Sequence, residues 1–457
     1  MEESDGARGP FPIADSVTIS NEVESRSIAA TASPAAAQRW AMLALLLVAF
    51  VFNHVDRSII SILQDPIKHE FRISDTQLGL MTGFAFALLH SISTMPFARL
   101  ADRGWGSEVI AISFAAFSCL TLGSGLATSF TFLLLMRIGV GIGEGGGVAP
   151  STALIVNLFP QRERGRAMGL YMLGPPLGVM FGILIGGLVS DRWGWRTAFV
   201  SVGAIGALLA PVVYVVVKRG ARGMASLAST QSPPIKFADA LRELWRIKAY
   251  RNVILAGLFL QLAHVSIVAW TPSFYIRVHG LSASHIGLYL GLMLGIGGGL
   301  GVMTGGWLAD RFARRDVRWF VWLPALSALL IMPAMWTQYL VPSANLSLLF
   351  AVVPNFLAYS TLGPYFASVL SLAQPRIRAT AHAVQGFAVV TVSVGLGPLI
   401  VGIASDHLAA HGVEHTLRYV LPAMSLLNIV AIGFFLRAGR TYAAECHHDA
   451  SPGHALH

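Results

Sequence analysis

Four ionisable side chains stand inside segments that are otherwise apolar enough to cross a membrane. Asp56 and Arg57 lie in one expected helix, and Arg137 and Glu144 lie in another. A charge at the centre of a bilayer costs roughly 2.5–3.5 kcal/mol on insertion scales, so such a side chain normally faces a cavity or a partner. We therefore expect these four residues, with the neighbouring Asn53, to form a proton-coupling or substrate site.

Depth along the helices predicts how these charges pair. With a rise of about 1.5 Å per residue, Asp56, Arg57 and Arg137 share a layer about 10 Å below one end of their helices, and Glu144 lies nearer the midplane. We expect an Asp56–Arg137 pair, and a titrating Glu144 with Arg57 as its partner. A carboxylate between an apolar interior and an arginine can load and release a proton as its surroundings alternate. The alternative is that the cluster only locks the two helices together.

The dipeptide Asp-Arg closes two other expected helices, at Asp102-Arg103 and at Asp310-Arg311. A carboxylate at this position can meet the N-terminus of a neighbouring helix, while the arginine anchors at the membrane interface. We interpret the two motifs as an inner gate that breaks when the protein opens. Simple topological anchors would contain the same residues, so that alternative stays open.

The second half of the chain carries no charge inside its expected spans and offers uncharged polar and aromatic groups instead. Asn355 and Tyr359 are four residues apart and so share a helix face. These groups are candidates for the C-half wall of a cavity, although core packing is an alternative role for each. The candidates are Gln261, His264, Trp270, Asn355, Tyr359, Tyr365, His382 and Gln385.

Other chemistry has no visible motif. The sequence contains no nucleophile with a partner base, no Walker sequence and no zinc motif, so we expect no enzyme, no ATP-driven pump and no cofactor. The histidines and Cys446 of the C-terminal tail fit no recognised metal-ligand spacing, and we expect no metal site. The expected ligands are a proton and a small-molecule substrate.

The elements that must position these residues are membrane-spanning helices. Of 457 residues, 54% are hydrophobic and only 12% are charged, with a mean hydropathy of +0.64. A soluble chain of this length needs more charge to solvate its surface. The formal charge of +9 lies at short connections between apolar runs, which indicates topology and not nucleic-acid binding. We expect an all-α polytopic membrane protein with helices at 39–62, 76–99, 107–127, 130–158, 165–189, 196–217, 252–276, 284–308, 318–339, 346–372, 380–404 and 417–437.

The distribution of Lys and Arg orients the chain. With the N-terminus inside, 24 of these residues fall on inner connections and tails and six on outer connections. The positive-inside rule then places both termini in the cytoplasm. No cleavable signal peptide is visible. The preference for Arg over Lys points to a GC-rich bacterial genome, so we expect the protein in a bacterial inner membrane. We also expect it to function as a monomer.

The chain also repeats itself. Ser74–Arg103 aligns without gaps on Ser282–Arg311, and Val189–Asp191 echoes Ala404–Asp406. Parallel six-helix repeats commonly enclose a site near the midplane and rock about it. We expect two six-helix bundles, at 39–217 and 251–438. A cytoplasmic linker with an amphipathic helix is expected at 218–250, and disordered cytoplasmic tails at 1–38 and 439–457.

At these motifs the chain resembles the major facilitator superfamily, and more closely its spinster branch. The resemblance covers roughly residues 40–437. Two of its segments, with the patterns Asn-x-x-Asp-Arg and Gly-x-Gly-Glu, are fairly specific together, whereas Leu-Ala-Asp-Arg marks only the superfamily. The segments that carry it are Phe52–Arg57, Ser74–Leu80, Arg137–Glu144, Arg164–Ala167, Gly305–Arg311 and Pro375–Ala381.

This resemblance implies a proton-linked or facilitated carrier that works by alternating access, with Asp56, Arg57, Arg137 and Glu144 as its coupling network. It makes lysolipid-like amphiphiles and other organic anions candidate substrates. A carrier of aromatic or other small organic acids is an alternative, as is a sensor that resembles a transporter but moves nothing. The chain departs from the family pattern at Gly106-Ser107, where a basic pair is usual.

Overall fold

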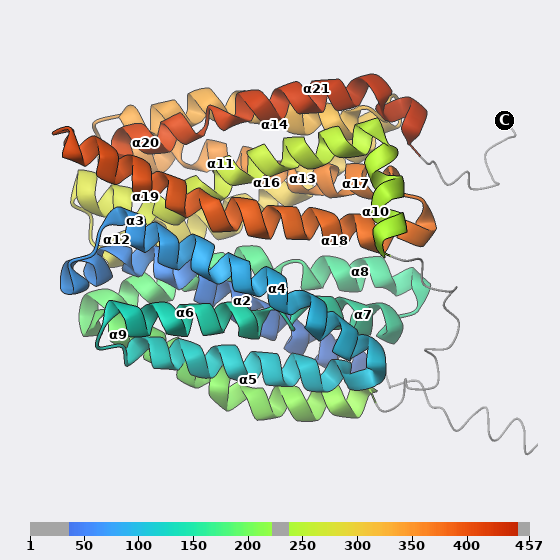
Figure 1. Cartoon of the computed structure of the whole chain (residues 1–457), viewed down its shortest axis with the longest axis horizontal. Coiled ribbons are helices and arrows are strands. Elements are labelled where there is room, and N and C mark those ends of the chain that lie inside the picture. The colour runs from blue at the N-terminus through green and yellow to red at the C-terminus, as the bar shows by residue number, and fades with distance from the viewer. Residues whose placement is uncertain (1–35, 222–236, 447–457) are drawn as a thin grey trace, which may run out of the picture.

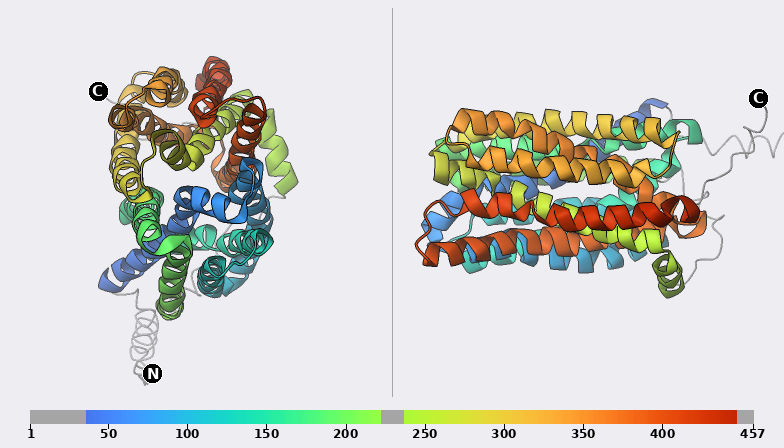
Figure 2. Two further views of the ribbon diagram at one scale, coloured as in Figure 1. Left: turned by 90° about the vertical axis from the view of Figure 1, so that its left-hand side faces the viewer. Right: turned by 90° about the horizontal axis from the view of Figure 1, so that it is seen from above.

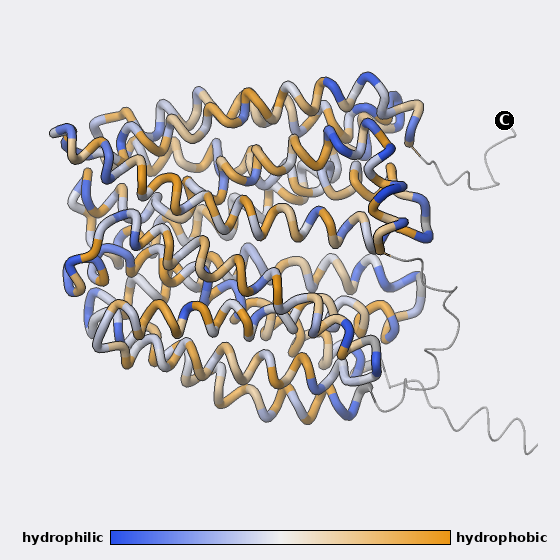
Figure 3. Tube along the Cα trace, in the orientation of Figure 1, coloured by the Kyte–Doolittle hydropathy of each residue, from blue (hydrophilic) through white to orange (hydrophobic). Residues whose placement is uncertain are grey.

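The structure is a computed structural model that describes residues 36–221 and 237–446. All regular elements in this part of the chain are helices. The helices run side by side along the long axis of the molecule, with the first half of the chain below the second in Figure 1. Apolar residues dominate their middle lengths, and hydrophilic residues gather at both ends (Figure 3). This distribution is that of a bundle that crosses a bilayer.

The described chain crosses twelve times. Eleven helical segments are long and apolar enough to span, but one of them, Arg162–Arg219, has 58 residues. Such a helix would be about 87 Å long, against a hydrocarbon core of about 30 Å. Gly194, with φ 82° and ψ 161°, turns the chain within this segment and divides it into two passes. A glycine is needed there because side chains rarely tolerate positive φ.

Each half of the chain forms its own bundle, and the two bundles pack against each other (Figure 2). The N-half consists of α2 (Ala36–Phe71), α3 (Asp75–Gly79), η1 (Leu80–Phe84), α4 (Ala85–Leu100), η2 (Ala101–Trp105), α5 (Gly106–Gly125), α6 (Phe130–Glu144), α7 (Val148–Leu158), α8 (Gln161–Tyr171) and α9 (Gly174–Ala221).

The C-half begins after α10 (Phe237–Arg246), an amphipathic helix between the two halves. It consists of α11 (Lys248–His279), α12 (Ala283–Leu292), η3 (Met293–Gly297), α13 (Gly298–Ala313), α14 (Trp319–Leu340), α15 (Ala344–Phe350), α16 (Val352–Ser360), α17 (Leu362–Ser371), η4 (Pro375–Ile377), α18 (Arg378–Ala388), η5 (Val389–Val394), α19 (Gly395–Ala410), α20 (Leu417–Met424) and α21 (Leu427–Glu445).

Some helices run past the ends that hydropathy predicted. The last helix continues to Glu445, so residues 439–445, expected in a disordered tail, are helical. Packing holds them there, because Tyr442 is buried and the Glu445 carboxylate accepts the Ala249 N–H at 2.7 Å. The remaining parts of the expected tails (1–35 and 447–457) and of the expected linker (222–236) lie outside the described residues.

The two halves are joined by a pair of related helix caps at one end of the bundle. We call this end the outer end, and the opposite end, where Ala36 and Cys446 lie, the inner end. The Asp406 carboxylate accepts the backbone N–H groups of Asp75 and Thr76 at 3.1 and 2.8 Å, and the Thr76 hydroxyl at 2.7 Å. Asp191 accepts the Ser284 N–H at 2.7 Å. Each carboxylate therefore meets the positive end of a helix in the other half.

Glycines let the halves approach closely at the same place. A Cβ on Gly187 of α9 would lie 2.2 Å from the Ala283 carbonyl oxygen, and a Cβ on Gly402 of α19 would lie 2.2 Å from the Asp75 carbonyl oxygen. Neither position has room for a larger residue while the backbones stay where they are. The outer end is thus closed by caps and by backbone contact.

Candidate transport site

Arg57 and Glu144 form an ion pair between α2 and α6. The Arg57 Nε donates to Glu144 Oε2 at 2.5 Å. The Glu144 side chain is fully buried, whereas 23% of the Arg57 side chain is exposed. The guanidinium also lies over the Phe86 ring, 4.9 Å from its centroid. The partnership expected from the sequence is therefore present, with the arginine as its accessible member.

Asp56 and Arg137 form a second pair, which is buried on both sides. Arg137 Nη1 donates to both carboxylate oxygens of Asp56, at 3.0 and 2.8 Å. Thr121 of α5 adds a third partner, since its hydroxyl donates to Asp56 Oδ1 at 2.5 Å. This contact was not anticipated, because a threonine in an apolar helix more often bonds its own backbone. The cluster ties α2, α5 and α6 together.

The glycines around Glu144 pack tightly against other helices. A Cβ on Gly141 would lie 2.5 Å from the Phe86 carbonyl oxygen, and one on Gly145 would lie 2.3 Å from Ser93 Oγ. Close helix packing therefore accounts for these glycines. It also places Glu144 against α4 and α5, away from any lipid-facing surface.

A cavity lies between the two halves, and we call it the central cavity. Its empty space, including its opening to solvent, is about 1230 Å³. Arg57 and Arg137 are the only charged side chains among its described lining residues, and His54, Ser58, Ser61 and Gln64 add polar groups from α2. The two carboxylates, Asp56 and Glu144, are not part of the lining. They pair with the arginines from outside the lining, so only two of the four charges expected in one site face the central cavity.

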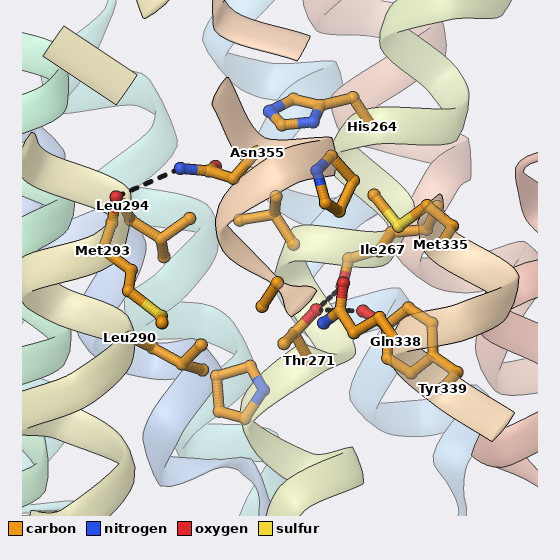
Figure 4. Close-up of a pocket in the computed structure, with 14 residues that line it drawn as sticks. His264, Ile267, Thr271, Leu290, Met293, Leu294, Met335, Gln338, Tyr339 and Asn355 are labelled. Atoms are coloured by element: carbon orange, nitrogen blue, oxygen red, sulfur yellow. Dashed lines mark hydrogen bonds between the residues drawn. The ribbon is translucent and has the colours of Figure 1, made fainter. Parts of the chain in front are cut away.

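The C-half supplies fewer of the predicted lining residues than expected. Gln261, His264 and Tyr359 line the central cavity. His264 also lines a neighbouring pocket within the C-half, where the Asn355 amide donates to the Met293 carbonyl oxygen at 3.2 Å (Figure 4). Aromatic and polar side chains from α11, α14 and α16 surround this pocket.

Four other candidates from the C-half do not line the central cavity. Trp270 is fully buried and donates through Nε1 to the Pro398 carbonyl oxygen at 3.0 Å. Tyr365 is buried against Gly257. Gln385 is buried as well, and His382 is exposed beside Phe366. Trp270, Tyr365 and Gln385 therefore occupy packing positions, the alternative considered for them. His382 lies on the surface.

The predicted inner gate is not assembled in this conformation. Arg103, Asp310 and Arg311 are exposed, and none of them forms an ion pair within the described residues, although Arg311 lies over the Trp307 ring. The Asp102 side chain lies outside the described part of the structure. Among the described residues, the gate motifs therefore form no ion pair at the inner end, whereas the outer end is held by the Asp191 and Asp406 caps.

The sequence analysis did not predict a charged network that lies at the outer end. Arg277 of α11 donates to Asp65 at 2.5 Å and to both oxygens of Asp75, at 3.0 and 2.8 Å. Lys68 donates to the same Asp75 at 2.6 Å. These residues were assigned to loops, because hydropathy ended α2 and α11 too early. The repeat alignment contained a signal for where the helices at the outer end begin, since it marked Ser74 and Ser282 as equivalent helix starts.

The chain was compared with known proteins. Residues 46–398 match the sequence profile of the Major Facilitator Superfamily. The chain belongs to this superfamily. It is 33% identical to a protein of Mycolicibacterium smegmatis named "MFS-type efflux pump". The alignment spans 405 residues and covers 88% of this chain and 93% of that protein.

Two solved structures of a bacterial homologue of the human lysosomal transporter Spinster share the fold of this transporter. The match to the inward-facing, unoccupied structure has a TM-score of 0.80 and 26% identity, and covers 92% of this chain and 100% of the matched chain. The match to the inward-facing, occupied structure has a TM-score of 0.77 and 27% identity, and covers 90% of this chain and 99% of the matched chain. The predicted fold and spinster resemblance are confirmed.

Proposed function

We propose that this transporter couples the movement of an amphipathic organic anion to a proton, and that Arg57 is the group that links the two. The supporting observation is the unequal lining of the central cavity. Its charged groups are two arginines on the N-half, and its C-half wall is mostly apolar, with Val265, Val268 and Leu362 beside a few neutral polar groups. An anionic head at Arg57 and an apolar body against the C-half would match both walls.

Coupling follows from competition for one guanidinium. A substrate anion at Arg57 must displace the Glu144 carboxylate, which holds Arg57 Nε at 2.5 Å. Protonation of Glu144 removes this competitor and strengthens anion binding. The reverse also holds, because an anion that takes Arg57 leaves Glu144 without its countercharge, and such a buried carboxylate favours its protonated form. The proton and the anion therefore increase each other's affinity by the same factor.

Alternating access completes the scheme. The Asp191 and Asp406 caps would break as the outer end opens, and the motifs at Asp102-Arg103 and Asp310-Arg311 would meet as the inner end closes. The positive-inside rule makes the inner end cytoplasmic, with both termini in the cytoplasm. The apolar C-half wall opposite two arginines favours an amphipathic lysolipid-like substrate over a small carboxylate.

Proteoliposomes test this function directly. Full-length protein should accumulate a fluorescent lysophosphatidylglycerol under a pH gradient and stop when the gradient is collapsed. Excess unlabelled lysophosphatidylglycerol should compete, and benzoate should not. Competition by benzoate would favour the organic-acid carrier. Absence of gradient-driven movement of any ligand that stabilises the protein would favour the sensor.

A further inference from the structure

A second cavity lies inside the N-half, and we call it the side chamber. It is small, with space for about one water molecule, and has walls from α2, α5, α6, α7 and α8. Glu144 belongs to the lining of the side chamber and not to that of the central cavity, whereas Arg57 belongs to the central cavity and not to the side chamber. The Arg57–Glu144 ion pair therefore stands between the two cavities, with one partner facing each.

Polar atoms at the side chamber lack partners within the described protein. Asn53 Oδ1, Ser113 Oγ and Glu144 Oε1 are buried and form no hydrogen bond with any described residue. An unsatisfied buried polar group costs about 1–3 kcal/mol. Ordered water normally satisfies such groups where a cavity offers room and several polar neighbours. Ser151 and Tyr171 add two hydroxyls to the same wall, so the side chamber has the lining of a water site.

A second space, which we call the inner pocket, lies nearer the start of α5 and shares the lining residue Ile110 with the side chamber. Its empty space, including its opening to solvent, is about 670 Å³, and it is lined by residues of α4, η2, α5 and α7, with Ser107 and Asn157 among its polar groups. Ile110 lines both spaces, so its side chain lies at the boundary where they approach each other. Ser107 and Ser113 are six residues apart on α5, about 9 Å along its axis.

We propose that protons reach Glu144 through the inner pocket and the side chamber, by a route inside the N-half that is separate from the substrate's path. The inference rests on the proposed function for the role of Glu144 and adds the route. A proton carried by water in the side chamber binds Glu144 Oε1 and converts the carboxylate to a neutral acid. Oε2 then loses its charge-assisted bond, and Arg57 presents its full charge to the central cavity.

The surroundings of Glu144 make it the proton acceptor of this route. The inner pocket and the side chamber contain no other carboxylate among their described lining residues. At the mouth of the inner pocket, Ser107 donates to Glu108 at 2.8 Å, and Glu108 pairs with Lys218. The charged and titratable groups around Glu144 are Arg57, Asp56, Arg137, His54, His90 and Tyr171.

A pH-jump experiment on the full-length protein tests the route without a substrate. Time-resolved infrared spectroscopy would follow the carbonyl stretch of protonated Glu144, assigned by its loss in Glu144→Gln. Ile110→Phe fills the junction between the two spaces and should slow protonation roughly tenfold, which equals about 1.4 kcal/mol on a barrier. Ile110→Ala widens the junction and should accelerate protonation. Val268→Phe, which narrows the central cavity instead, is the matched control and should leave the rate unchanged.

The possible outcomes separate the route from the function. A rate that responds to Val268→Phe and to neither Ile110 variant would overturn the route and leave the proposed coupling intact. A Glu144 band that appears at constant pH when sodium is removed would show that the side chamber holds a metal cation, which also overturns the route. A Glu144 band that never appears over the whole stable pH range would overturn both the coupling and the route.

Discussion

Asp191 and Asp406 occupy equivalent positions in the two halves, and each caps the first turn of a helix in the opposite half. Asp406 binds the start of α3, and Asp191 binds the start of α12. The aligned sequences of the two repeats mean that one ancestral contact is present twice, at two corners of the outer end. A carboxylate at a helix N-terminus contributes about 0.3–1 kcal/mol at an exposed site and up to about 2 kcal/mol when partly buried.

Removing these charges should open the outer end. Asp406→Asn keeps the size of the side chain but removes its charge, and should shift the equilibrium toward the outward-open state roughly fivefold, the effect of about 1 kcal/mol. Asp191→Asn should add a similar shift because the two caps lie at different corners. Spin labels at the exposed positions 69 and 411, in a background without Cys119 and Cys446, would report the distance across the outer end.

Asp239→Asn is a suitable control for this experiment, because Asp239 is exposed on α10 and pairs with Arg242 of the same helix. It should leave the distance distribution across the outer end unchanged. If the double variant of Asp191 and Asp406 gave the wild-type distribution, the caps would not hold the outer end closed.

A methyl group at Gly187 should have a larger effect than the loss of a cap. The Cβ of Gly187→Ala would lie 2.2 Å from the Ala283 carbonyl oxygen, so α9 and α12 must separate before the outer end can close. We expect labels across the outer end to report mainly the open state, with transport strongly reduced. Gly433→Ala in α21 is the matched control, since its Cβ would meet nothing within 4 Å. Normal closure in Gly187→Ala would contradict the close approach of these helices.

The Asp56–Arg137 pair should matter chiefly for stability. Asp56→Asn leaves Arg137 buried with no countercharge, and should destabilise the protein by roughly 3–5 kcal/mol. Thr121→Val removes one hydrogen bond to the carboxylate and should cost roughly 1.5–3 kcal/mol. Thermal unfolding in detergent would rank the variants. The double variant Asp56→Asn with Arg137→Gln should recover part of the loss, and an equal or greater loss in the double variant would exclude the pairing argument.

The pairing of the four intramembrane charges was predictable from depth and from the cost of isolated charges in hydrocarbon. Helix rise placed Asp56 and Arg137 in one layer, and the need for a countercharge left Arg57 as the partner of Glu144. The Arg277–Asp75 contact was not predictable in the same way, since it depends on where α2 and α11 end and on how the halves meet. The position of Trp270 was not predictable either. Its residue type and its place in an apolar helix made it a candidate for the cavity wall, but only the packing of α11 against α19 shows that its indole donates to the Pro398 carbonyl oxygen.

The side of Arg57 that is exposed to the central cavity should determine which headgroups bind. Arg57→Gln should weaken binding of lysophosphatidylglycerol roughly tenfold or more, because a hydrogen bond between charged groups is replaced by a weaker neutral one. Binding of an uncharged monoacylglycerol of the same chain length should change little. Arg57→Lys should restore the charge but only part of the affinity. Equal losses for both lipids would indicate a collapsed cavity and not a lost anion site.

The most direct test of coupling is the pH dependence of ligand affinity, measured by fluorescence polarisation with labelled lysophosphatidylglycerol, whose phosphodiester stays ionised across the range. Protonation of Glu144 frees Arg57, so affinity in the wild-type transporter should rise as pH falls. Glu144→Gln mimics the protonated state and should keep the low-pH affinity at every pH, while losing proton-driven accumulation. If Glu144→Gln instead kept the wild-type slope of affinity against pH, Glu144 would not be the group that links the proton to the substrate.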